Sequence, residues 1–156
     1  MALRYFNIFG PRQSCDSPYS GVVARFCRAM LRGETPVIYG DGRQSRDFTY
    51  VENVVRANVL AAEAPAERVT GGVFNIACGE GIDLLRLVED LSRLTGRNVT
   101  PRFEPARVGD VRCSQADISA AQAAFGYSVV VPWLEGLSRT LDWYRSGERV
   151  AAGGAS

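Results

Sequence analysis

The sequence predicts an α/β fold, because short apolar runs alternate along the chain with segments whose apolar residues recur at helical spacing. Leu3–Ile8 is an apolar and aromatic run that a Gly-Pro pair follows, which is typical of a buried strand. Val73–Ala77 is a second such run. Between them, Ser20–Arg32 carries apolar residues on one helical face and ends at Gly33, as amphipathic helices commonly do.

The remaining elements follow from the same periodicities and from capping residues. Asp83 precedes an amphipathic helix that Gly96 ends, and Asp117 precedes a shorter one. The helix after Tyr50 has apolar residues around most of its surface, which predicts that it is well buried. The other expected elements are a loop at 11–19, extended segments at 36–39, 47–51 and 98–103, a helix from 132 to about 144, and a disordered tail at 147–156.

Composition excludes several classes of protein. The 156 residues suffice for one compact domain, and 46% hydrophobic with 22% charged residues is ordinary for a globular protein. A net charge of +1 favours neither nucleic acid nor an anionic membrane, so we expect neither as a partner. The first residues lack the layout of a signal peptide, and we expect a cytoplasmic protein.

Two residue types are missing, and this limits the chemistry. The chain has no histidine and no lysine, so all 18 basic residues are arginine. It therefore has neither the commonest general acid–base group nor a Schiff-base lysine. The four cysteines form no C-x-x-C pair, so we expect reduced thiols and no metal site.

Three segments, in this order, carry a resemblance to a known family: residues 3–13, 38–51 and 107–111. Together they resemble the C-terminal part of extended short-chain dehydrogenase/reductases, the NAD-dependent nucleotide-sugar epimerase/dehydratase family whose type member is UDP-glucose 4-epimerase, an isomerase. The resemblance covers about residues 2–146. It implies the C-terminal part of an extended Rossmann-type epimerase, with two parallel strands of the large sheet and the small substrate-binding lobe.

The resemblance also implies a division of the chain. Residues 2–8 and about 47–78 would be the part of the nucleotide-binding sheet that is present. About 9–46 and 79–146 would form the substrate-binding lobe.

The resemblance implies a site for a UDP- or TDP-sugar. Arg46 and Arg107 would grip the diphosphate, which arginine can bind with two parallel hydrogen bonds. Asn7 would offer its amide to the phosphate or sugar, Asp110 would bind a ribose hydroxyl, and Pro11 would lie near the nicotinamide of NAD. The pocket for the nucleotide base would be lined by Val22, Phe26, Val37 and Tyr39.

Each of these residues also has a plainer interpretation. Arg46 precedes Asp47 and would simply form a surface ion pair with it. Arg107 would be solvated, Asn7 would cap a turn, and Val22 and Phe26 would be core residues. The sequence leaves these alternatives open.

The family's catalytic machinery is not found in this sequence. No G-x-x-G-x-x-G turn follows a strand, and no Tyr-x-x-x-Lys pair exists, so we expect no catalytic residue and no NAD bound to this chain alone. The chain would then be a fragment of an epimerase, dehydratase or decarboxylase, arising from proteolysis, a split or truncated gene, or excision. Alternatively it would be a non-catalytic binding module, or a subunit that pairs with a separate NAD-binding chain.

We also expect a homo-oligomer, because Leu3–Ile8 would be a sheet edge with unpaired backbone groups. A monomer in which a loop or the tail folds over that edge is the alternative.

Overall fold

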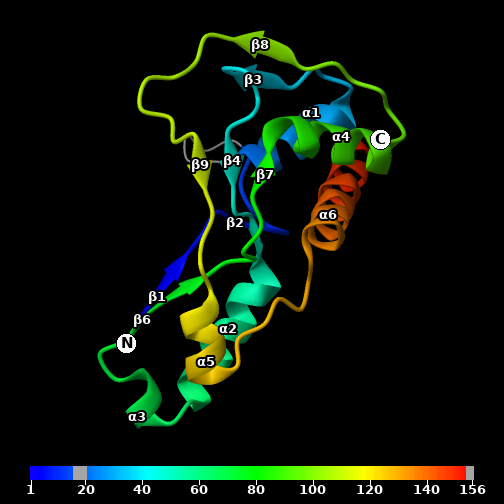
Figure 1. Cartoon of the computed structure of the whole chain (residues 1–156). Coiled ribbons are helices and arrows are strands. Elements are labelled where there is room, and N and C mark those ends of the chain that lie inside the picture. Colours follow the sequence, from blue (N-terminus) through cyan, green and yellow to red (C-terminus); the bar gives the residue numbers. More distant parts are fainter. Residues whose placement is uncertain (16–20, 154–156) are drawn as a thin grey trace.

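The computed structural model describes residues 1–15 and 21–153, and its elements form two lobes (Figure 1). The first, which we call the pocket lobe, is built on the helices α1 (Val22–Arg32), α4 (Leu84–Thr95) and α6 (Trp133–Gly153). The second, the strand lobe, contains the strands β1 (Ala2–Tyr5) and β6 (Val73–Ile76) and the helices α2 (Val51–Glu63), α3 (Ala66–Val69) and α5 (Ser119–Phe125). The α/β class is confirmed.

The strands form small, mostly parallel sheets. β1 pairs with β6 in parallel, as the sequence predicts. Two other parallel pairs join β2 (Ile8–Phe9) to β5 (Thr49–Tyr50) and β3 (Val37–Tyr39) to β8 (Arg102–Glu104). The last sheet has β4 (Ser45–Arg46) at its centre, with β7 (Ile82–Asp83) antiparallel on one side and β9 (Cys113–Ser114) parallel on the other.

The expected strand at residues 3–8 is interrupted. Asn7 has a φ of +33°, so the chain turns between β1 and β2. Asparagine adopts this left-handed region more readily than most residues. The turn directs β1 into the strand lobe and β2 into the pocket lobe, where it pairs with β5.

The helices of the pocket lobe end where the sequence predicts. The Asp83 carboxylate accepts the backbone N–H of Arg86 at 2.8 Å and caps α4. Gly33 and Gly96 end α1 and α4 in the left-handed conformation that glycine adopts without strain. α1 packs against both α4 and α6.

An aromatic cluster joins β2, β5 and α6. The ring of Trp133 stacks on Phe48 with centroids 5.3 Å apart and lies at the same distance from Phe9. Its indole N–H donates to the buried Asp90 carboxylate at 2.8 Å. A side chain at Gly136 would come within 2.9 Å of Tyr50, so glycine lets α6 approach that ring.

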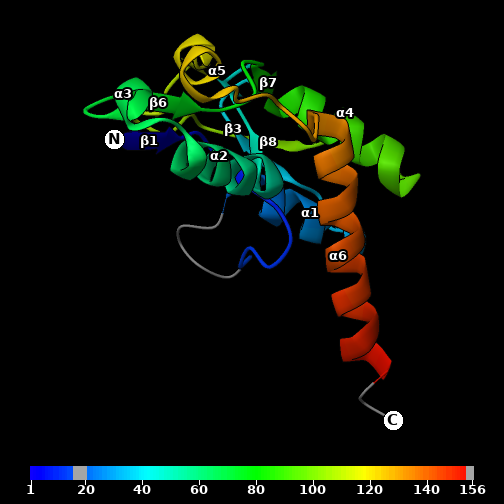
Figure 2. The ribbon, with the colours of Figure 1, turned by 90° about the horizontal axis from the view of Figure 1, so that it is seen from below.

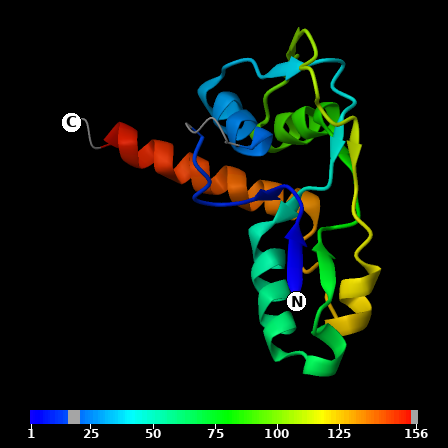
Figure 3. The same ribbon diagram turned by 90° about the vertical axis from the view of Figure 1, so that its left-hand side faces the viewer.

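The strand lobe has its own apolar core. Val54 and Ala57 of α2 and Phe125 of α5 are buried in one cluster with Phe74 of β6. Figure 3 shows α2 and α5 on either side of the β1–β6 pair. Residues 118–127 thus pack with the strand lobe, although the sequence analysis placed them in the substrate lobe. The reason is that α5 contacts β6 directly.

The expectation that α2 is well buried holds for one face only. Val51, Val55 and Val59 recur every four residues on its outer face and are 37%, 57% and 50% exposed. We call these three residues the valine stripe. Composition alone suggested burial, but only the opposite face of α2 meets the strands.

The helix α6 is longer than expected. Figure 2 shows it projecting from the body of the molecule as far as Gly153. A disordered tail was expected from residue 147, but the segment has no proline and carries good helix formers. Residues 154–156, and part of the expected loop at 11–19, lie outside the described residues.

Candidate functional site

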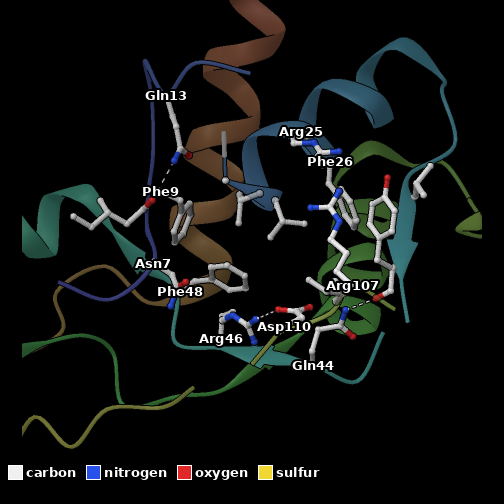
Figure 4. A pocket seen from close by; sticks show the side chains of 18 of the residues that line it. Asn7, Phe9, Gln13, Arg25, Phe26, Gln44, Arg46, Phe48, Arg107 and Asp110 are labelled. Atoms are coloured by element: carbon white, nitrogen blue, oxygen red, sulfur yellow. Dashed lines mark hydrogen bonds and ion pairs between the residues drawn. The ribbon is translucent and has the colours of Figure 1, made fainter. Parts of the chain in front are cut away.

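A cavity of about 450 Å³ opens in the pocket lobe between β2, α1, β3 and β4 (Figure 4). It brings together every side chain that the sequence analysis assigned to the substrate: Asn7, Val22, Phe26, Val37, Tyr39, Arg46, Arg107 and Asp110. Pro11, expected near the nicotinamide, lies in the turn after β2 and is not among the lining residues.

Arg46 is held in place by its backbone and its side chain. Its strand is paired on both sides, with Ile82 of β7 and Ser114 of β9 opposite Arg46. The guanidinium donates to the carbonyl of Ser45 at 2.9 Å and to that of Val111. It also forms an ion pair with Asp110. The plainer interpretation, a surface pair between Arg46 and its neighbour in sequence, is therefore wrong.

That neighbour, Asp47, is fully buried and faces away from the cavity. Its carboxylate accepts the backbone N–H groups of Cys78 at 2.8 Å, Gly79 at 2.9 Å and Ala116 at 3.1 Å. Burial raises the pKa of Asp47, and the three N–H donors oppose that shift. One side chain next to Arg46 thus joins two distant segments, at residues 78–79 and at residue 116, to the end of β4.

Asn7 stands at the turn between the two lobes. Its side-chain amide nitrogen donates to the backbone carbonyl of Asp47 at 3.3 Å. Its backbone carbonyl accepts the backbone N–H of Thr49 at 3.2 Å. The side chain is exposed to the cavity. Asn7 therefore makes a turn, as its plainer interpretation has it, and it also lines the cavity.

The segment between β8 and β9 forms the exposed wall. The guanidinium of Arg107 lies 3.8 Å from the centroid of the Tyr39 ring, a cation–π contact, so Arg107 is not simply solvated. Gly109, at a φ of +83°, lets this wall turn back so that Asp110 reaches Arg46. The carbonyl of Tyr39 accepts the side-chain amide of Gln44 at 2.6 Å.

The apolar wall is shared with the core. Phe26 is 4% exposed and belongs to the main apolar cluster of the pocket lobe. Val22 and Val37 are half-buried. These side chains therefore both stabilise the lobe and shape the cavity.

Sequence reasoning missed three polar lining residues: Gln13, Arg25 and Gln44. Gln13 and Gln44 lie inside the segments that carried the family resemblance, so that signal was available. No sequence signal marked Arg25 as a cavity residue, because a charged residue on an amphipathic helix normally indicates only a solvated face.

The chemistry of the cavity is that of anion binding. Among the residues that the structure describes, the charged ones that line it are three arginines and one carboxylate, Asp110. Arginine stays protonated and is a poor general base. The arrangement suits a ligand that joins an anionic group to a planar ring.

Within residues 1–15 and 21–153, no group of three or more potential metal ligands is present. Nor is any helix in that part of the chain long and apolar enough to cross a membrane.

Comparison with known proteins identifies relatives over nearly the whole chain. The family model described as the NAD dependent epimerase/dehydratase family matches residues 1–77. A UDP-N-acetyl-alpha-D-glucosaminuronate decarboxylase from Bacillus cytotoxicus is 35% identical over 94% of this chain and 46% of its own length. A UDP-glucose 4-epimerase from Mycolicibacterium smegmatis is 36% identical over 90% of this chain and 44% of its own length. The chain thus spans about half the length of the curated relatives it matches.

Solved structures give the same result. A UDP-glucose 4-epimerase from Thermotoga maritima, determined with UDP-glucose, is 42% identical with a TM-score of 0.86. The match covers 94% of this chain and 46% of that one. A UDP-N-acetylglucosamine 4-epimerase from Methanobrevibacter ruminantium, in complex with UDP-N-acetylmuramic acid, is 41% identical with a TM-score of 0.85 over the same shares.

Proposed function

Because this chain belongs to the NAD dependent epimerase/dehydratase family, we propose that it is the nucleotide-sugar-binding portion of such an enzyme and is not catalytically complete alone. The observation that carries the proposal is a single cavity that combines Arg46 and Arg107 with an aromatic wall. Its volume of about 450 Å³ is in the usual range for small-ligand sites.

The cavity offers complementary groups for each part of such a ligand. Arg46 is fixed on a strand paired on both sides, and it would contact the diphosphate at little further cost in side-chain entropy. Tyr39 and Phe26 would contact the flat base, and Arg107 would bind a phosphate from the exposed wall. Asp110 would accept a ribose hydroxyl.

The residues of this chain do not fit a complete NAD site. A dinucleotide pyrophosphate binds where a glycine-rich turn leads from a strand into a helix N-terminus. The sequence has no G-x-x-G-x-x-G turn. The N-terminus of α4 is already occupied by the Asp83 carboxylate, which would repel a phosphate. We therefore propose that NAD, which is present in four of the neighbouring structures, is held elsewhere in a working enzyme.

Calorimetry with UDP and UDP-glucose tests the binding proposal. Each charge-assisted contact to phosphate contributes about 1.5–3 kcal/mol, so Arg46→Ala and Arg107→Ala should each weaken binding about tenfold or more. Arg145→Ala is the matched control, because that arginine pairs with Asp142 on α6 and does not line the cavity. Unchanged affinity in both cavity variants, or no binding of UDP to the parent chain, would refute the proposal.

A turnover assay tests catalytic incompleteness. The chain incubated with NAD and UDP-glucose should form no UDP-galactose, and the purified protein should show no absorbance from bound NAD. The reason is the missing lysine that would activate a tyrosine base. Measurable interconversion of the two sugars would contradict this.

A second candidate role is that of an interaction subunit, and one observation favours it. β1 pairs with β6 alone among the described strands, and the valine stripe is exposed. An unpaired strand edge near exposed apolar residues is a template for association. We propose that this face is covered by a second copy of the chain, most simply in a two-fold dimer, or by a separate NAD-binding chain.

Light scattering decides between these and the monomer. A mass of twice the chain at micromolar concentration supports the dimer, whereas a monomer that gains mass only with an NAD-binding chain supports the subunit.

We further propose a cytoplasmic location, since all four cysteines are free thiols.

A further inference from the structure

Asp110 is a carboxylate that lines an anion-binding cavity. In Figure 4 it points toward Arg46, and the two side chains form an ion pair in which Arg46 is 20% and Asp110 36% exposed. A carboxylate at this position opposes the binding of an anion, because like charges repel. Its contact with the arginine that would bind the diphosphate therefore requires an explanation.

The ion pair uses the part of Arg46 that a phosphate would need. The Nη1 nitrogen of Arg46 donates to the carbonyls of Ser45 and Val111, and its Nη2 nitrogen donates to the carboxylate of Asp110. Arginine binds phosphate most strongly through two adjacent N–H groups. With Nη1 taken, that pair is Nε and Nη2. A phosphate and the Asp110 carboxylate therefore compete for the same edge of the guanidinium.

Asp110 is the partner that moves when a phosphate takes this edge. Arg46 lies on a strand that is paired on both sides. Asp110 lies in the segment 105–113, in which every residue is exposed, and a side chain at Gly109 would meet no other atom within 4 Å. A segment that buries none of its side chains is displaced at a small cost in free energy. A bound phosphate would therefore leave Arg46 in place and displace Asp110.

We propose that Asp110 determines the specificity of this site for a nucleotide against inorganic phosphates, because its ion pair with Arg46 must exchange partners when a phosphate binds. This inference rests on the proposed function. A phosphate that takes Arg46 leaves the Asp110 carboxylate without its donor. A nucleotide supplies a new donor through its ribose hydroxyls, whereas pyrophosphate offers mainly acceptor oxygens. The exchange therefore weakens the binding of pyrophosphate more than the binding of UDP.

Calorimetry with pyrophosphate and with UDP, on the parent chain and on Asp110→Asn, tests this exchange. Asparagine keeps the shape of the side chain and removes its charge. The variant should bind pyrophosphate about threefold to fivefold more tightly than the parent chain, the range expected when one partly exposed ion pair no longer competes. Its affinity for UDP should rise less or fall, so the preference for UDP over pyrophosphate should decrease. A parent chain that binds UDP but no measurable pyrophosphate, with a variant that binds both, supports the proposal equally.

Asp41→Asn is the matched control, because Asp41 is also an aspartate paired with an arginine, Arg112, but does not line the cavity. It removes the same charge, and it should change the affinities for both ligands by the same factor. If Asp110→Asn raises both affinities equally, or leaves the affinity for pyrophosphate unchanged, the role of Asp110 in specificity is overturned while the proposed function stands. If the parent chain binds no UDP, the proposed function fails and this inference fails with it.

Discussion

The pocket lobe and the strand lobe differ in how completely each buries its own apolar side chains. In the pocket lobe, three helices enclose an aromatic cluster, and Trp133, Leu137 and Leu141 on α6 are almost fully buried. In the strand lobe, two parallel strands lie between helices, but the valine stripe and Tyr5 remain exposed. The pocket lobe thus encloses its core, whereas the strand lobe leaves one strand edge and one helix face uncovered by the described residues.

Parallel sheets are usually larger and buried on both faces, so a two-stranded parallel pair is marginal by itself. Buried polar groups tie it to the pocket lobe. Asn53 of α2 accepts the N–H groups of Val130 and Val131 at 3.0 and 2.9 Å and donates to the carbonyl of Val131 at 2.8 Å. The strand lobe therefore depends on its hydrogen bonds to the pocket lobe for part of its stability.

The largest effect is expected from the centre of the pocket lobe. Trp133→Ala would open a cavity beside the rings of Phe9 and Phe48 and leave Asp90 without its indole donor, so we expect a loss of about 4 kcal/mol in the free energy of unfolding. Urea denaturation measures it. Trp143→Ala, on the same helix but 38% exposed, should lower that energy by less than half as much. Equal losses of unfolding energy in the two variants would show that the buried position of Trp133 contributes no more to stability than an exposed position on the same helix.

The second effect concerns the link between the lobes. Asn53→Leu would leave the N–H and the carbonyl of Val131 buried and unpaired and would remove the partner of the part-buried Val130 N–H, which should lower the free energy of unfolding by about 3 kcal/mol. Asn58→Leu is the control on the same helix, since Asn58 is exposed. The control should change the energy by less than about 1 kcal/mol. A separate, earlier unfolding transition of the strand lobe in the Asn53 variant would sharpen the comparison further.

The third effect separates stability from association. Replacing Val55 and Val59 together by serine removes apolar groups that are already in water, so the unfolding energy of a monomer should change by about 0.5 kcal/mol or less. The mass measured by light scattering should fall if this face is an interface. Phe103→Ser, which changes an equally exposed residue of the pocket lobe, should leave the mass unchanged. A mass that responds only to the Phe103 variant would place the interface on the other lobe.

The smallest effect is expected from a surface ion pair beside the cavity wall. Hydrogen bonds from Arg112 and from the backbone of Arg43 lower the pKa of Asp41 to about 2, from an ordinary value of 3.8. The folded state therefore binds a proton less readily than the unfolded state. The stability that this gives is present above pH 3.8 and is lost as the pH falls through about 2.

The advantage of the parent chain over Asp41→Asn in thermal unfolding should accordingly shrink between pH 6 and pH 2. An advantage that grew on acidification would contradict the assignment. Glu89→Gln serves as the control, because Glu89 pairs with Arg93 on α4 and both side chains are largely exposed.

Much of this fold follows from sequence because its signals are local. The amphipathic helices α1 and α4 end at Gly33 and Gly96, and Asp83 caps α4 as predicted. Part of the cavity lining was also predictable, since Asn7, Tyr39, Arg46, Arg107 and Asp110 lie in the segments that resemble the family. No local signal distinguishes a solvated arginine such as Arg25 from one that lines a cavity.

The sequence by itself determined the alternation of helices and strands, the absence of histidine and lysine, and the residues gathered at the cavity. Only the tertiary structure decided which partner each of those residues takes. Arg46 pairs with Asp110, sixty-four positions away, rather than with the adjacent Asp47, because strand pairing turns successive side chains to opposite sides. The exposure of the valine stripe was likewise decided by tertiary structure, because burial depends on what lies against a face and not on its composition.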